Sequence, residues 1–329
     1  MAPRPAPARD PARAKAALRR RRAAMRLAAA GVGVAVGASV LGLVWPRSDR
    51  SQEPQALGRV ADLAKPPTRP VTVLVIGSDA DRPGDASNGA APPGPANSDA
   101  LLLLRVQAGA PLQVLEIPIE TAVQLPGQRR PQALGSLYRQ GGVALVADAV
   151  RELTGLPSTQ PDRYVVVPRG ALRQLIAALG ALDLSPPQAM RYADRRQNLR
   201  IDLQAGLQRL DGQQVEHLVR FRDPVAGEDG RRQQHQLVLR ALLRELSQPG
   251  RLPLLAPLAR QMLAETQSDL SEAELLSLLA AGLDQGEAVN VQTLPLDPPQ
   301  PQHKGLRQLA PAAAATLGWG SDSGSGSGN

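Results

Sequence analysis

VTVLVIGSD, residues 71 to 79, is a short run of β-branched and aliphatic residues that ends in glycine, serine and aspartate. A run of this length and composition is typical of a strand buried inside a sheet. Asp79 then follows the carboxyl end of that strand, where open α/β sheets bind their ligands. The stretch predicts an α/β domain with a candidate site at one edge of its sheet.

The segments on either side of this strand alternate between short apolar runs, typical of strands, and apolar residues at helical spacing. Further strands are predicted at 100–106, 112–118, 163–168 and 288–294. Apolar residues at helical spacing predict helices at 142–154, 172–179, 211–219, 231–246, 252–264 and 271–281, and Ser271 to Glu274 reads as a capping box. Strands and helices in this order favour a layered α/β domain, which we place at residues 71–295. The Gly- and Ser-rich residues 296–329 are expected to form a flexible tail.

The N-terminal part predicts a membrane anchor. Residues 27–45 contain no charge over nineteen residues, and as a helix they would span roughly 28 Å, close to the hydrocarbon thickness of a bilayer. Residues 1–26 hold nine of the 38 lysines and arginines, so the other 29 balance the 29 acids of the remaining chain. The positive-inside rule places this arm in the cytoplasm and residues 46 onward outside, with 46–70 as a Pro-rich spacer.

Two other interpretations of the N-terminal part remain open. A cleaved signal peptide is one, although the apolar run is long and no clear small-residue cleavage site follows it. Nucleic-acid binding by Arg19–Arg22 is the other, but a basic arm beside a span usually sets topology. We therefore expect a single-pass protein of the plasma membrane with an extracytoplasmic body, with the lipid bilayer but no nucleic acid as a partner.

Composition excludes several kinds of catalytic site. The 329 residues include no cysteine, which removes disulfides, thiolate metal sites and cysteine nucleophiles. The three histidines are scattered, and no Ser-His-Asp order, HExxH or Walker A motif is present.

Carboxylates flank the loop that follows the first strand. Asp79 opens this loop and Asp99 closes it, so neighbouring strands would bring the two side chains together. Two carboxylates combined with water and phosphate oxygens are a usual way to bind Mg²⁺. The alternative is that both are ordinary turn residues.

A second group of candidate residues lies in LVRFRDPVAGEDGRRQQ, residues 218–234. Arg220 and Arg222 are two positions apart, and Arg231 stands near the start of a predicted helix, where anions are favoured. Guanidinium groups bind phosphate oxygens in pairs, which suits a diphosphate. A solvated charged surface with Asp223, Glu228 and Asp229 as partners is equally compatible with the sequence.

The order of several motifs resembles the LytR–CpsA–Psr family. The motifs are IGSD (76–79), NSDALLLL (97–104), EIPIET (116–121), DRYVVVPRGALRQLIAALGALDL (162–184), LQAGLQRLDGQQVEHLVRFR (203–222) and GRRQQHQ (230–236). The resemblance covers roughly residues 71–295 and implies an α/β/α sandwich around a mixed central sheet, with an apolar tunnel for a lipid. It further implies a phosphotransferase that moves a glycopolymer from a polyprenyl-diphosphate carrier onto peptidoglycan.

The resemblance also implies roles for individual residues. Asp79 and Asp99 match the Mg²⁺ ligands, and Arg220, Arg222 and Arg231 match the diphosphate-binding arginines, with Gln234 also at a substrate-binding position. Glu120 and Asp99 are the two candidates to accept the proton of the attacking hydroxyl. The apolar residues of 143–153 and 172–179 are candidates to line the tunnel.

Several departures from the family pattern fall on this site. Ile119 and Glu120 replace the Arg and Asp of the I-P-R-D motif, and Asn97 replaces an arginine. Gln234 and His235 stand where Arg and Gln are expected. These departures keep two other readings open, a non-catalytic protein that binds polyprenyl phosphate or scaffolds envelope enzymes, and a hydrolase.

Overall fold

The computed structural model describes residues 59–85, 94–196, 198–286, 288–300, 305–311 and 319. The predicted basic arm, membrane span and most of the spacer lie outside these residues. In the part of the chain that is described, no helix is both long and apolar enough to cross a bilayer.

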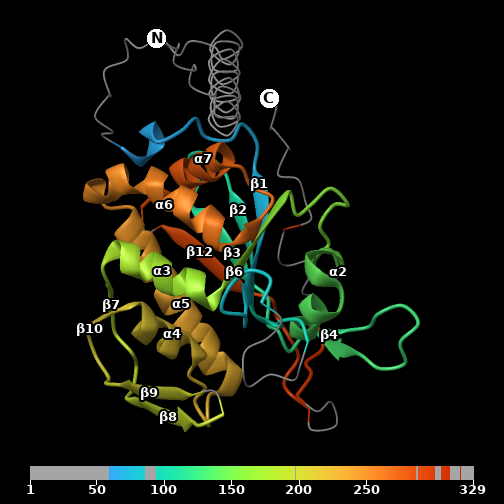
Figure 1. The fold of residues 1–329 in the computed structure, drawn as a ribbon. Coiled ribbons are helices and arrows are strands. Elements are labelled where there is room, and N and C mark those ends of the chain that lie inside the picture. The colour runs from blue at the N-terminus through green and yellow to red at the C-terminus, as the bar shows by residue number, and fades with distance from the viewer. Residues whose placement is uncertain are drawn as a thin grey trace, which may run out of the picture. The chain divides into compact units, whose positions relative to one another are not determined.

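A six-stranded mixed sheet forms the centre of the domain (Figure 1). Its order is β11 (Gln267–Ser268), β6 (Arg163–Pro168), β1 (Val71–Ser78), β2 (Ser98–Val106), β3 (Leu112–Glu116) and β12 (Val289–Thr293). The pairs β1–β6 and β3–β12 are parallel, and the other neighbours are antiparallel. Five of these strands are the ones predicted from the sequence, and the two-residue β11 is the exception.

Helices cover both faces of the sheet. On one face α2 (Leu137–Thr154) packs Val146 and Val150 against Leu74 and Leu103 of β1 and β2. On the other face lie α5 (Gly227–Leu246), α6 (Leu252–Glu265) and α7 (Glu272–Leu283), which pack near Val114 of β3. The alternation of side chains along each strand supplies both layers with apolar residues, because successive residues point to opposite faces. The α/β/α sandwich is therefore confirmed.

A second apolar core lies below the sheet in Figure 1. It is built by α3 (Arg169–Leu179), α4 (Gly212–Arg220) and two antiparallel strand pairs, β7 (Leu182–Leu184) with β10 (Gln208–Leu210), and β8 (Met190–Asp194) with β9 (Leu199–Leu203). These four short strands were not predicted from the sequence. In β9 every second residue is buried and the residues between them are charged. An alternation over five residues was therefore the sole sequence feature that could have predicted this strand.

The helix predictions are confirmed with shifted ends. Helix α2 begins five residues earlier than predicted and has non-helical backbone at Gly141 and Gly142. The capping box of α7 is present, since Ser271 Oγ accepts from the N–H of Glu274 and Glu274 accepts from the N–H of Ser271.

The remaining elements are short. They are β4 (Ala122–Val123), β5 (Gln132–Ala133), and the 3₁₀ turns η1 (Val60–Asp62), η2 (Leu134–Ser136) and η3 (Pro249–Arg251).

Part of the predicted tail packs against the domain. Leu296 and Leu309 contact the core under α2, and Leu309 forms a β-bridge to Leu296. Trp319 is buried in the same core, and the guanidinium of Arg105 lies 4.7 Å from the centre of its ring. The packed part of the chain thus extends beyond the predicted domain boundary at residue 295.

Candidate active site

A β-bulge places Asp99 next to Asp79. Gly77 of β1 pairs with Ala100 of β2, whereas the next residue, Ser78, pairs with Ser98, so Asp99 is an extra residue on β2. A bulge redirects the side chain that it carries, and bulges are frequent beside active sites. The N–H of Asp79 donates to the carbonyl of Asn97 at 3.1 Å, and the N–H of Asn97 donates to Asp79 Oδ1 at 2.9 Å. These two hydrogen bonds close the loop that separates the two carboxylates.

The charges around Asp99 show that the predicted residues come together. Burial raises the pKa of Asp99, and repulsion from the Asp79 carboxylate raises it further. Arg231, Arg222 and Arg220 oppose this shift through their positive charges. The Asp99 side chain remains 47% exposed. The charges of Asp79 and of all three arginines predicted from the sequence therefore act on Asp99.

Glu228 holds two of the three arginines. Arg231 lies in the first turn and a half of α5 and is only 7% exposed, with Nη2 2.6 Å from Glu228 Oε2 and Nη1 3.9 Å from Asp99 Oδ1. Arg222 is 58% exposed, and its Nη2 lies 3.1 Å from Glu228 Oε1. One carboxylate therefore aligns a buried guanidinium and an exposed one on the same side of the helix start.

Arg220 also takes part in a buried ion-pair cluster around Glu216, which the sequence did not reveal. Its Nη1 donates to Glu216 Oε1 at 3.0 Å, one helical turn away on α4. Glu216 is buried and also pairs with Arg173 and with Arg169, whose Nη1 lies 3.7 Å from Oε1. Because β6 runs parallel to β1, with Ser78 opposite Pro168, Arg169 lies beside Asp79 at the carboxyl edge of the sheet. The parallel pairing of these two strands was not deducible from the sequence, so nothing in the sequence marked Arg169 as a residue of the site.

Glu120 lies between two further arginines. Its Oε1 accepts from Arg232 Nη1 at 2.8 Å and lies 3.7 Å from Arg307 Nη1. Arg232 also pairs with Asp229. Neither Arg232 nor Arg307 was singled out in the sequence.

Gln234 and His235 face the backbone of α4. Gln234 is buried, and its amide nitrogen, in the orientation that its surroundings require, lies 2.8 Å from the Leu218 carbonyl and 2.9 Å from that of Phe221. His235 Nε2 donates to the Val219 carbonyl at 3.2 Å, and burial followed by the charge of Arg231 lowers the pKa of His235 to about 4. The structure thus places Gln234 on the carbonyls that flank Arg220, where it fixes the backbone and does not point toward Asp99.

The residues at this edge fit a divalent cation that is completed by a substrate. Among the described residues, no three carboxylates or histidines are close enough to hold a metal ion by themselves. Asp79 and Asp99 supply two carboxylates, and Mg²⁺ is commonly bound by one or two carboxylates together with phosphate oxygens and water. The small pocket beside Asp99 is lined by the carboxylates of Asp99, Glu116, Glu120 and Glu228 and by only two guanidiniums, those of Arg231 and Arg232. This excess of carboxylates favours an added cation.

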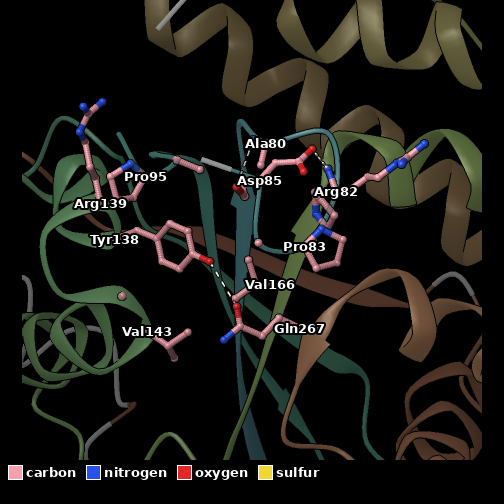
Figure 2. A pocket seen from close by; sticks show the side chains of 15 residues that line it. Ala80, Arg82, Pro83, Asp85, Pro95, Tyr138, Arg139, Val143, Val166 and Gln267 are labelled. Carbon is pink, nitrogen blue, oxygen red and sulfur yellow. Dashed lines mark hydrogen bonds between the residues drawn. The ribbon is translucent and has the colours of Figure 1, made fainter. Parts of the chain in front are cut away.

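A cavity of about 460 Å³ opens next to the same loop. Ser78 and Ala80, the two neighbours of Asp79, line it, and Tyr138 and Val143 of α2 face Val166 of β6 and Gln267 of β11 (Figure 2). Its volume lies within the range of small-molecule sites. The helix predicted at 172–179 does not line this cavity, since Leu172 and Leu175 pack into the second core instead.

Comparison with known proteins identifies the family. The LytR_cpsA_psr family matches residues 47–314. The chain belongs to this family.

Two relatives and one solved structure indicate which family members it resembles. It is 30% identical over 159 residues to the probable cell wall biosynthesis protein LcpB of Corynebacterium glutamicum, a match that covers 48% of this chain and 36% of LcpB. It is 23% identical over 216 residues to TagU of Enterococcus faecalis, named a polyisoprenyl-teichoic acid–peptidoglycan teichoic acid transferase, over 65% of this chain and 66% of TagU. The crystal structure of B. subtilis TagV has the same fold, with a TM-score of 0.62 and 18% identity over 76% of this chain and 95% of TagV.

Proposed function

We propose that this protein transfers a glycopolymer from a polyprenyl-diphosphate carrier to peptidoglycan. One observation carries the proposal, namely that Asp79 and Asp99 lie together at the carboxyl edge of β1, with the guanidinium of Arg231 3.9 Å from Asp99 and Glu228 joining Arg231 to Arg222. The name of the relative TagU describes a reaction of this class. We further propose that the protein acts from the plasma membrane as a single-pass protein, with residues 27–45 as its anchor.

The side chains present suit phosphoryl transfer, which depends mainly on positioning and on neutralising charge. Arg220, Arg222 and Arg231 would bind the diphosphate oxygens, because guanidinium groups pair with them in a fixed geometry. Asp79 and Asp99 would hold Mg²⁺, which when bound would neutralise further negative charge on the phosphates. Glu120 or Asp99 would take the proton from the attacking hydroxyl of peptidoglycan as polyprenyl phosphate departs.

We also propose that the 460 Å³ cavity receives the first part of the lipid chain. Its lining includes Val143 and Val166, and Ser78 and Ala80 bring it within one residue of Asp79. A lipid seated there would leave its diphosphate beside the carboxylates.

A second candidate function is binding of the carrier without transfer. Ile119 supplies no charge where the family motif has arginine, and it packs against the core under α2. Loss of one charge contact of this type reduces rates on the order of 10²–10³-fold. The transfer experiment described next separates these two functions.

The test uses the full chain in detergent with a synthetic polyprenyl-diphosphate-sugar, Mg²⁺ and peptidoglycan fragments. We expect wild type to form a sugar-phosphate adduct and Arg231→Ala to reduce its rate by at least about 10²-fold without unfolding. Arg209→Ala is the matched control, since Arg209 is exposed and its Nη1 lies 3.9 Å from Asp183, far from the site in the fold.

Each other outcome has its own meaning. Unchanged transfer by Arg231→Ala would contradict the proposed site. Bound carrier without any product would favour the binding protein, and polyprenyl phosphate released without an adduct would favour hydrolysis. Arg231→Lys serves as a second variant, because it keeps a charge beside Glu228 should the alanine variant lose stability.

A further inference from the structure

The C-terminal segment 305–311 lies directly against the proposed catalytic residues. The N–H of Arg307 donates to the Glu120 carbonyl at 3.0 Å, and the N–H of Ala122 donates to the Arg307 carbonyl at 2.8 Å. Thr121 and Arg307 form a parallel β-bridge, so the segment runs alongside the chain that leads into β4. In Figure 1 this part of the chain, coloured red, lies next to β4. A segment far away in the sequence is thus fixed to the backbone of Glu120.

The side chain of Arg307 is held as firmly as its backbone. Its Nε donates to the Asp297 carbonyl at 2.9 Å, and its Nη2 donates to the Leu296 carbonyl at 3.3 Å. The remaining terminal nitrogen, Nη1, lies 3.7 Å from both Glu120 Oε1 and Asp229 Oδ1. The two backbone contacts orient the guanidinium so that its free end faces the two carboxylates.

One carboxylate oxygen of Glu120 contacts arginines, and the other has no hydrogen-bond partner among the described residues. Oε1 accepts from Arg232 and faces Arg307, whereas Oε2 is buried and has no hydrogen-bond partner among the described residues. Leaving a buried polar atom unsatisfied costs about 1–3 kcal/mol, and such atoms in folded proteins call for an explanation. Glu120 lines the same small pocket as Asp99 and Arg231.

We infer that Arg307 is a positioning residue, which holds Glu120 so that Oε2 accepts the proton of the attacking hydroxyl. This inference rests on the proposed transfer reaction. In that reaction the acceptor oxygen forms a bond to the phosphorus that carries the polymer, and the bond from that phosphorus to the oxygen on the carrier side breaks. The proton of the acceptor hydroxyl goes to Glu120 Oε2, and polyprenyl phosphate leaves with the bonding electrons. The C-terminal segment is therefore part of the catalytic site.

A double-mutant cycle in the full-length protein tests this inference. The variants are Arg307→Ala, Glu120→Gln, the double variant, Arg307→Lys and the control Arg209→Ala. Arg307→Ala should lower kcat roughly tenfold, and the KM for the lipid donor should stay unchanged because Arg220, Arg222 and Arg231 are intact. The double variant should be no slower than Glu120→Gln, because residues that act as a unit give non-additive losses. Arg307→Lys should recover part of kcat, and the control should match wild type.

Three outcomes would overturn the inference. The first is an unchanged kcat in Arg307→Ala, and the second is a double variant whose loss equals the product of the two single losses. A lower Tm together with a raised donor KM in both Arg307 variants would likewise show a role in folding only.

A second measurement keeps this inference separate from the proposed function. Carboxyl groups are labelled with a carbodiimide and glycine ethyl ester, and labelling of Glu120 is measured by mass spectrometry. Arg307→Ala should increase labelling of Glu120 over wild type and leave Glu216 unchanged. If wild type shows no transfer, the proposed function fails. The labelling still decides whether Arg307 holds Glu120, and unchanged labelling would contradict that.

Discussion

Substitution of Glu216 is the change that we expect to lower the free energy of unfolding most. It is buried, and its carboxylate contacts the guanidiniums of Arg169, Arg173 and Arg220. Removing one partner of a buried ion pair costs about 3–5 kcal/mol, because the opposite charges are left uncompensated. Glu216→Ala should therefore lower the free energy of unfolding by about 3 kcal/mol in urea titrations and raise the KM for the lipid donor through Arg220.

Glu152 on α2 offers the matched control for this prediction. Its side chain is exposed, so Glu152→Ala should change the free energy of unfolding by no more than about 0.5 kcal/mol. Equal stability of the two variants would show that Glu216 does not hold the arginine cluster together.

Asp162 should make stability depend on pH. Burial by itself raises the pKa of Asp162, but hydrogen bonds from the N–H and hydroxyl of Thr72, both 2.7 Å long, together with Arg69, outweigh it and lower the pKa below 3.8. The stabilisation is thus complete above the unfolded pKa and is lost as the pH falls through the folded one.

Urea unfolding of wild type and Asp162→Asn tests whether stability changes with pH in this direction. The variant should be less stable by about 1–3 kcal/mol near about pH 6, and the difference should shrink toward about pH 3. A difference that stays constant over this range would contradict the assignment.

At the residue scale, the sequence singles out charged groups near a recognisable strand or motif as candidates. Asp79 and Asp99 are candidates because of their places around the loop, and Arg220, Arg222 and Arg231 because of their spacing and the family resemblance. Arg169, Glu216 and Arg307 could not be found in this way, since each reaches the site through a contact between segments far apart in the chain.

Among the elements, the start of α3 is fixed tightly to the loop that carries Asp79. The N–H of Gly170 donates to the Asp81 carbonyl at 3.0 Å, and a Cβ at Gly170 would lie only 2.3 Å from that carbonyl oxygen. Gly170→Ala should push the loop away from α3 at a cost of about 1–3 kcal/mol. Because displacements near 1 Å cost on the order of 10²-fold in rate, transfer should fall by at least about tenfold.

Gly250 provides the comparison for this element. A Cβ there would meet no atom within 4 Å, so Gly250→Ala should leave both Tm and the transfer rate close to wild type. Equal activity in the Gly170 and Gly250 variants would show that the loop does not need its contact with α3.

The predictability of an element followed its length and its apolar content. Within the described residues, the strands of the six-stranded sheet other than β11 and the helices α2 to α7 were predicted, because each carries a run or a periodic stripe of apolar residues. The strands β7 to β10 have three to five residues each. Buried residues alternate with exposed charged ones in β7 and β9, whereas β8 buries only its first residue, and all four strands depend on packing in the second core with α3 and α4. The bulge at Asp99 is a matter of strand register, which no single segment encodes.

For the whole molecule, the predicted topology can be tested through the absence of cysteine. Because the chain has no cysteine of its own, a single introduced cysteine is the only thiol of this protein that a membrane-impermeant maleimide can label. In intact cells Glu152→Cys should react from outside, and Ala12→Cys should react only after the membrane is permeabilised. Labelling of Ala12→Cys in intact cells would place the arm outside and contradict the anchor.

The transfer reaction itself tests the central claim most directly. The measurement is the mass balance of the wild-type chain incubated with polyprenyl-diphosphate-sugar, Mg²⁺ and peptidoglycan fragments, followed by mass spectrometry of lipid and glycan products. The proposed function predicts that each polyprenyl monophosphate released is matched by one sugar joined to peptidoglycan through a phosphodiester, and that chelating Mg²⁺ stops both. Carrier that stays intact on a folded protein, or monophosphate released without a matching adduct, would contradict it.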